Sequence, residues 1–167
     1  MAAKPKAPRI MACAASTQGL ATICLNGRTL KHWQMSRAHL HDHDKARSHL
    51  RLLALRFGID AFVIENPFDH CRKGRRARDL LQALIQNIED EAFPVIQLRR
   101  IRLYESRLAE ARAMTKRFPP IAPHCPKRWP PRTNPPRDIL YFEALAFASA
   151  VLDDPSLIAR CTNSDAD

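Results

Sequence analysis

A continuous apolar segment at residues 61–64 is the feature that most constrains the fold of this chain. Its four residues, alanine, phenylalanine, valine and isoleucine, show no alternation of polar and apolar side chains. Such a run is typical of a strand that is buried on both faces of a sheet. Strands of this kind occur where helices cover the sheet, so the segment predicts an α/β protein.

Apolar residues at helical spacing lie on both sides of this run and predict helices there, the first of them before the run and the others after it. Asp42 or Asp44 can cap the first helix, and Gly58 stands where that helix is expected to stop. A fifth strand is expected at residues 94–98, and a last helix from Ile139 to about Asp153. The apolar stripes are Ala46, Leu50, Leu53 and Phe57 in the first helix, Ala77, Leu80, Leu84 and Ile88 in the second, and Tyr104, Leu108 and Ala111 in the third.

The N-terminal third predicts three strands in meander order. Two short apolar runs occur at residues 10–14 and 21–25, and Asn26-Gly27 follows the second. This dipeptide favours the two-residue turn of a hairpin, because both positions tolerate positive φ. With residues 28–35 as the return strand, the element order is β-β-β-α-β-α-β-α-loop-α. We therefore expect a mixed five-stranded sheet flanked by helices.

The length of 167 residues is that of one domain with tails. Residues 1–9 are expected to form a flexible basic arm, residues 10–155 the domain, and residues 156–167 a polar tail. Eight of the 13 prolines lie between Pro119 and Pro136, in a proline-rich basic segment before the last helix. That segment is either a rigid arm over a ligand or a passive crossover.

The net charge indicates the class of partner, and the cysteine content indicates the cellular compartment. Lys and Arg number 27 against 17 Asp and Glu, a net charge of +10, which indicates an anionic partner. The five cysteines form no C-x-x-C pair, which favours reduced thiols in the cytoplasm over disulfides or a zinc site. The apolar runs are too short to span a membrane, so no membrane contact is expected.

Two basic clusters are the candidate nucleic-acid-binding residues. Five cations fall within seven residues directly after the central strand, at the start of the second helix. Cations at a helix N-terminus oppose the helix dipole, so we expect an anion to compensate them. Other cations precede the third helix, or flank a tryptophan that can stack on a base. The candidates are Arg72, Lys73, Arg75, Arg76, Arg78, Arg99, Arg100, Lys127, Arg128 and Trp129. A solvated basic face is the alternative.

Glu65 is a candidate metal ligand, because it directly follows the buried strand. Two divalent cations held by carboxylates roughly 4 Å apart can activate a water and stabilise the leaving oxygen of a phosphodiester. In the alternative reading Glu65 only ends its strand and meets solvent or an arginine.

Two short motifs resemble those of the RuvC-like Holliday junction resolvases. Residues 62–67, Phe-Val-Ile-Glu-Asn-Pro, resemble the strand-four motif of this family, and residues 138–146 are similar to its last-helix signature. The resemblance implies a ribonuclease H-like fold and a Mg²⁺- or Mn²⁺-dependent endonuclease that acts on branched DNA as a homodimer. It further implies that Glu65, Glu143 and Asp138 are catalytic, with Glu65 and Glu143 as metal ligands.

The first strand departs from this family at a position that matters for catalysis. Family nucleases carry an aspartate there, whereas this chain has Cys13 or Ala14 and no acidic residue before Asp42. Neither side chain can bridge two magnesium ions, because hard cations take oxygen ligands. Asp42, Asp69 and Asp138 are the acids left as substitutes.

The sequence therefore predicts a nucleic-acid-binding RuvC-like protein with a depleted endonuclease site, for which DNA is favoured over RNA. The alternative is a non-catalytic structural or adaptor protein of a nucleoprotein assembly, such as a phage particle or a ribosome.

Overall fold

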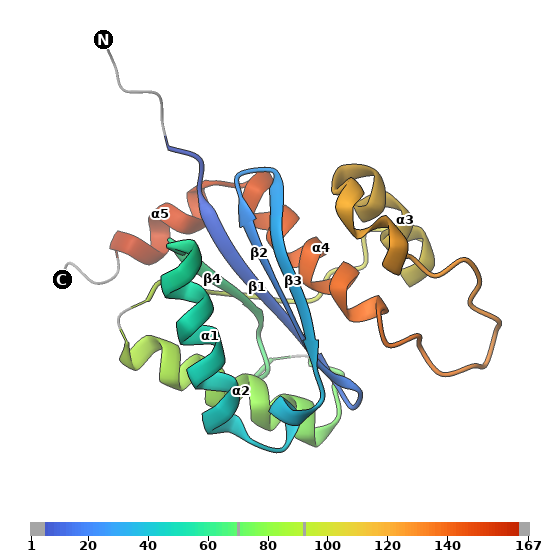
Figure 1. The fold of residues 1–167 in the computed structure, drawn as a ribbon, viewed down its shortest axis with the longest axis horizontal. Helices are drawn as coiled ribbons and strands as arrows, with labels where there is room; N and C mark the ends of the chain where they lie inside the picture. Colours follow the sequence, from blue (N-terminus) through green and yellow to red (C-terminus); the bar gives the residue numbers. More distant parts are fainter. Residues whose placement is uncertain (1–5, 70, 92, 164–167) are drawn as a thin grey trace, which may run out of the picture.

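One mixed sheet of five strands organises the molecule. The computed structural model describes residues 6–69, 71–91 and 93–163. The strands are β1 (Arg9–Ser16), β2 (Gly19–Asn26), β3 (Thr29–Ser36), β4 (Ala61–Glu65) and β5 (Val95–Leu98), in the order β3-β2-β1-β4-β5 (Figure 1). The first three form an antiparallel meander, and β1, β4 and β5 run parallel. The predicted mixed five-stranded sheet is confirmed.

Helices cover both faces of this sheet. On one face lie α1 (His43–Phe57) and α2 (Arg75–Asp90). On the other lies α4 (Ile139–Asp153), and α3 (Arg107–Arg117) packs against α4. Two 3₁₀ segments, η1 (Ala38–Leu40) and η2 (Pro119–His124), precede α1 and follow α3. The five strands and their covering helices have the arrangement of a ribonuclease H-like fold, which the element order predicted.

Local signals in the sequence set the first helix and hairpin. The side chain of Asp42 accepts a hydrogen bond from the backbone of Lys45, so it caps α1. Gly58 adopts the left-handed conformation, with φ of 58°, and ends α1. Gly27 has φ of 55° in the tight turn between β2 and β3. All three follow the sequence prediction.

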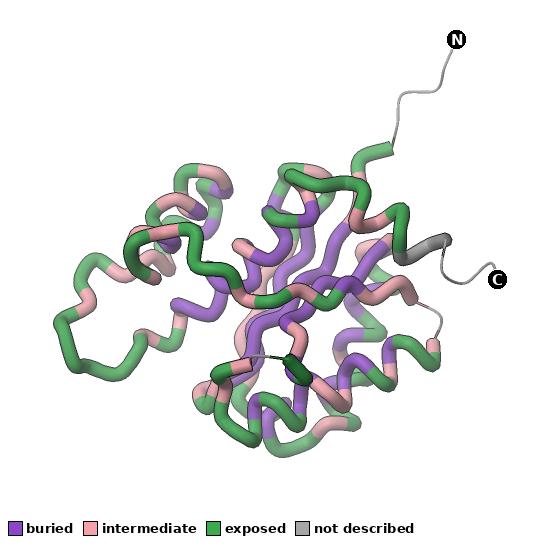
Figure 2. The backbone as a smooth tube through the Cα atoms, turned by 180° about the vertical axis from the view of Figure 1, so that it is seen from behind, coloured by how far each residue is buried: buried purple, intermediate pink, exposed green. Residues whose placement is uncertain are grey.

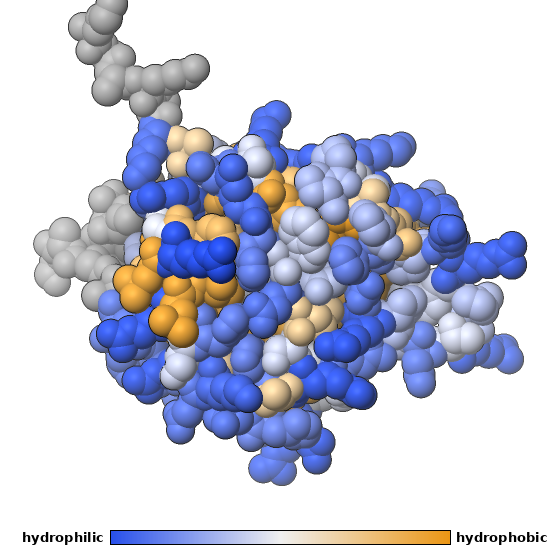
Figure 3. Space-filling view, viewed as in Figure 1, coloured by the Kyte–Doolittle hydropathy of each residue, from blue (hydrophilic) through white to orange (hydrophobic). Residues whose placement is uncertain are grey.

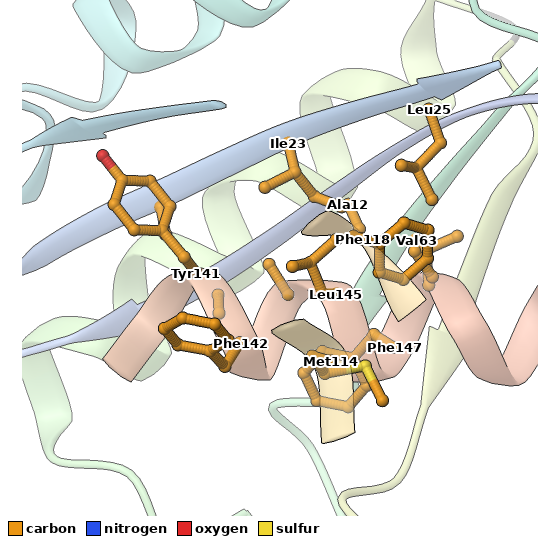
Figure 4. Packing of buried hydrophobic residues seen from close by; sticks show 14 of the residues in the cluster. Ala12, Ile23, Leu25, Val63, Met114, Phe118, Tyr141, Phe142, Leu145 and Phe147 are labelled. Atoms are coloured by element: carbon orange, nitrogen blue, oxygen red, sulfur yellow. The ribbon is translucent and has the colours of Figure 1, made fainter. Parts of the chain in front are cut away.

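The alternation of β1 divides the core into two layers. Ala12 and Ala14 point toward α4 and share that layer with Val63, whereas Cys13 points toward α1 and α2 together with Ile64. Figure 4 shows α4 side chains such as Leu145 aimed at the sheet residues of the first layer. The middle of β1 and all of β4 are buried (Figure 2). Because β4 alternates in the same way, its residue 65 lies on the α4 side.

Three boundaries differ from the sequence expectation. The third helix begins at Arg107 and not near Tyr104, because Ser106 caps it. A short helix, α5 (Ser156–Asn163), begins where a loose tail was expected. Arg9 belongs to β1 and not to the arm, since it pairs with Asn26 of β2. Its backbone and side chain also bind the carboxylate of Asp60. Residues 1–5 of that arm lie outside the described residues.

The exposed surface is mostly polar. The face shown in Figure 3 is largely hydrophilic, as expected for a chain with 26% charged residues, and carries one apolar patch at the left of the view. None of the described helices is long and apolar enough to cross a membrane.

Candidate nucleic-acid cleft

A cleft of about 1060 Å³ opens at the edge of the sheet where the parallel strands end. Ligands of α/β proteins commonly bind at this edge. Ser16 ends β1 and Glu65 ends β4 in its wall. Its charged lining comprises six cations, Arg72, Lys73, Arg99, Arg100, Arg102 and Arg107, and three carboxylates, Glu65, Glu110 and Glu143.

Glu65 and Glu143 meet at one ammonium group. Glu65 is the last residue of β4 and Glu143 lies in the second turn of α4, and each is only 3% exposed. Lys73, from the connection between β4 and α2, places its Nζ 3.6 Å from Oε2 of Glu65. The same Nζ donates a hydrogen bond to Oε1 of Glu143. Two oxygens that both lie within ~4 Å of one nitrogen are less than about 8 Å apart, so the structure brings these two carboxylates together.

Two arginines complete the ionic floor of the cleft. Nη2 of Arg107 donates a hydrogen bond of 2.8 Å to Oε2 of Glu143. The guanidinium of Arg107 also lies 5.7 Å from the ring centroid of Trp129. Arg100 binds both carboxylate oxygens of Glu110 at 2.5 and 3.1 Å. Each of the three buried carboxylates therefore has a cation beside it.

The pKa values of the two glutamates move in opposite directions. Burial raises the pKa of Glu65, and the Lys73 charge opposes this rise while the Glu143 charge adds to it. Burial acts in the same sense on Glu143, but the charges of Lys73, Arg100 and Arg107 outweigh it and lower the pKa of Glu143. The negative charge of Glu143 is therefore well compensated by neighbouring cations, and that of Glu65 is less so.

Ala14, and not Cys13, is the residue of β1 that lies beside Glu65. Cys13 pairs in register with Ile64, so Ala14 comes beside Glu65 on the α4 side of the sheet. Cys13 points to the opposite layer, and burial raises the pKa of its thiol to about 12. Its thiol is therefore neutral at physiological pH. The methyl group of Ala14 offers no ligand, so the first strand brings no carboxylate to the cleft.

The residues present do not fit a two-metal centre. Hard cations need several oxygen ligands, and two of them need bridging carboxylates. Within residues 6–69, 71–91 and 93–163, no group of three or more His, Cys, Asp or Glu is arranged to hold a metal ion. Both oxygens of Glu143 already bind cationic side chains, those of Lys73 and Arg107.

The other candidate acids lie outside the lining of the cleft. Oδ2 of Asp138 is 2.9 Å from Nδ1 of His124, whose Nε2 accepts a hydrogen bond from Trp33. Asp42 caps α1, and Asp69 is exposed in the connection between β4 and α2. The structure therefore joins Glu143 to Glu65 but places Asp138 elsewhere.

The predicted basic residues separate into three groups. Arg72, Lys73, Arg99 and Arg100 line the cleft. Arg75, Arg76 and Arg78 are exposed at the start of α2. Lys127 and Arg128 are exposed after η2, whereas Trp129 is half-buried beside Arg107. Sequence reasoning did not single out Arg102, Arg107 or Glu110, although all three lie in the basic stretch from residue 97 to residue 137.

Comparison with known proteins gives a likeness of structure and not of sequence. No family model matches this chain, and no curated protein matches it. The structure of Thermus thermophilus RuvC in complex with a Holliday junction substrate is similar with a TM-score of 0.57 at 13% identity, over 92% of this chain and 95% of that one. A second T. thermophilus RuvC structure has a TM-score of 0.57 at 15% identity, over 91% and 95%. This chain therefore has the RuvC-like form of the ribonuclease H-like fold.

Proposed function

We propose that this protein binds branched DNA in its basic cleft through phosphate contacts, and that its depleted acidic centre does not support two-metal cleavage. The observation that carries this proposal is the position of the Lys73 ammonium, which lies between the two buried carboxylates of a RuvC-like cleft. RuvC of T. thermophilus, which shares the fold, has been observed with a Holliday junction.

The charge balance of the cleft supports a polyanionic ligand. Lys73, Arg100 and Arg107 each contact a buried glutamate. Arg72, Arg99 and Arg102 are exposed in the lining and leave the cleft with three more cations than carboxylates. Exposed cations that neutralise phosphates release condensed counterions, and this release drives most non-specific DNA binding. Arg75, Arg76 and Arg78 extend the positive surface onto the start of α2.

An exposed aromatic side chain lies in the same connection as Lys73. Phe68 is 62% exposed. A base that leaves the stack at a branch point can stack on such a ring, and this contact tolerates any sequence. Phe68 thus supports branched over regular duplex DNA as the ligand. Because a four-way junction is two-fold symmetric, we propose that two copies of the chain bind one junction.

Two-metal cleavage needs a bridging carboxylate between the ions. The first strand contributes Ala14 at that place, and the Lys73 ammonium already pairs with both Glu65 and Glu143. The cleft therefore keeps the positive potential that attracts DNA but lacks the ligands for the chemical step.

A binding and cleavage experiment on one labelled four-way junction tests both halves of the proposal. A linear duplex with the same arm sequences is the control, and Mg²⁺, Mn²⁺ and EDTA are compared at matched ionic strength. We expect tighter binding to the junction, similar affinity in all three buffers, and no cleavage products. Light scattering of the complex is expected to show two chains per junction. Cleavage that Glu65→Gln abolishes would make this protein an enzyme, and failure to bind any nucleic acid would favour an adaptor role.

A further inference from the structure

The ammonium group of Lys73 lies between the carboxylates of Glu65 and Glu143 and pairs with both. Both carboxylates are 3% exposed, and an uncompensated ion costs several kcal/mol at such depth. Lys73 is the only side chain in the described part of the chain that forms an ion pair with Glu65. Among the described residues it is therefore the one cation that pairs with both glutamates, while Arg107 pairs with Glu143 alone.

We propose that Lys73 is a resident cation that replaces a divalent metal in this cleft, and that Glu65 and Glu143 form a latent Mn²⁺ or Mg²⁺ site which opens when the ammonium is removed. This inference concerns the chain without nucleic acid, so it stands or falls separately from DNA binding.

An unpartnered buried oxygen points to a ligand at this place. Oε2 of Glu65 is buried and has no hydrogen-bond partner, because Nζ of Lys73 stays 3.6 Å away. A carboxylate oxygen with unused lone pairs is a suitable ligand for a hard cation. Replacing Lys73 removes one positive charge from the site. Glu143 still keeps its ion pair with Arg107.

The location of Lys73 makes the exchange structurally feasible. The residue lies before Gly74, the N-cap of α2, and outside every helix and strand. Its side chain is 14% exposed in the wall of an open cleft, so a hydrated ion can reach the carboxylates from solvent. Replacing its amine therefore changes charge without interrupting an element of the fold.

Thermal unfolding with and without Mn²⁺ tests this inference in wild type, Lys73→Ala and Lys73→Met. We expect the wild-type Tm to be the same in Mn²⁺ and in EDTA. The neutral variants are expected to melt lower in EDTA, and to rise by about 5–10 °C when Mn²⁺ is present at roughly 100 times its Kd. Electron paramagnetic resonance of free Mn²⁺ gives the stoichiometry, which is expected to be about one ion per neutral-variant chain and none for wild type.

Two matched controls make the result specific. Arg72→Met removes the neighbouring cation of the same cleft wall and is expected to gain no Mn²⁺ binding. Adding Glu65→Gln to Lys73→Met is expected to abolish the gain. The proposal is overturned if wild type binds Mn²⁺ in a Glu65-dependent way, or if folded neutral variants bind none. It is equally overturned if both neutral variants stay unfolded in Mn²⁺ and in EDTA alike.

Discussion

Nη2 of Arg107 donates a hydrogen bond of 2.8 Å to Oε2 of Glu143, and this contact joins α3 to α4 across the floor of the cleft. The other oxygen of the same carboxylate accepts from Lys73, which belongs to the connection between β4 and α2. One buried glutamate thus holds three separate parts of the chain in place. The shape of the cleft depends on these ion pairs as well as on apolar packing.

Arg107→Ala is expected to lower the free energy of unfolding by about 1–2 kcal/mol, because a charge-assisted hydrogen bond to a buried carboxylate is lost while Lys73 remains. The loss of stability is modest because the Arg107 side chain is 36% exposed, and solvent screens its charge. Urea unfolding measures the change. Arg112→Ala, an exposed position on the same helix, is expected to stay within about 0.5 kcal/mol of wild type. An equal loss in both variants would contradict a specific role for the Arg107 contact.

The two glutamates are expected to give opposite pH dependences of stability. The lowered pKa of Glu143 means that the unfolded chain binds more protons near the ordinary value of 4.5, so its stabilisation is present above that pH and is lost as pH falls through the folded-state pKa. The raised pKa of Glu65 has the opposite effect on stability. The free energy of unfolding falls as pH rises from 4.5 through the folded-state pKa of this group.

Unfolding of Glu143→Gln and Glu65→Gln across the acid range measures these two slopes. At neutral pH we expect Glu143→Gln to be less stable than wild type, and Glu65→Gln to be at least as stable as wild type. The Glu143→Gln deficit is expected to shrink toward low pH. A Glu65→Gln protein that is clearly destabilised at neutral pH and recovers in acid would show that both carboxylates are stabilised as anions.

Replacing Arg72, Arg75 and Arg76 with alanine is expected to weaken DNA affinity for all sequences. Each lost phosphate contact is expected to reduce the log–log salt slope on duplex DNA by about 0.9. Lys73 is left out of this set because it binds Glu65 and Glu143. The charge-matched control replaces Arg28, Arg51 and Arg56, which are exposed and do not line the cleft. A salt titration that gives the same slope for both triple variants would place the binding surface elsewhere.

The register of β1 predicts different outcomes for two aspartate substitutions. Ala14→Asp puts a carboxylate beside Glu65, where it adds a third negative charge to a buried site. Alone it is expected to cost about 3 kcal/mol or more, and together with Lys73→Met it is expected to regain stability in Mn²⁺. Cys13→Asp points into the layer of α1 and α2 and is expected to be destabilised without any response to Mn²⁺. A Mn²⁺ response in the Cys13 variant would contradict this register.

Local patterns were sufficient to predict most of the fold. The apolar run at residues 61–64 became the buried strand β4, and the stripe ending at Phe57 became α1, with Asp42 and Gly58 at its ends. These features were predictable because strand burial, helix capping and tight turns depend on residues that are close in sequence. The helix α5 was missed because it spans only eight residues, and so short an apolar stripe is not distinctive in the sequence.

The cleft was predictable only in part. Glu65 and Glu143 were expected to meet, and the structure brings them together. Five clustered cations were expected to face an external anion, but Lys73 turns inward to the two glutamates. Asp138 was a candidate partner of Glu143, yet it lies beside His124 outside the cleft lining. Five positions along α4 separate Asp138 from Glu143, so the two side chains leave the helix in different directions.

The sequence by itself determined the element order, the buried central strand, the excess of positive charge and the absence of an aspartate on the first strand. Only the tertiary structure decided which cation compensates which carboxylate. Lys73 and Glu143 are 70 residues apart, and Arg107 and Glu143 are 36 apart. Their contacts arise when α4 and the connection after β4 pack at one edge of the sheet. The reason is physical: a charge pattern is a local property of the chain, whereas burial, which makes pairing necessary, is a property of the folded molecule.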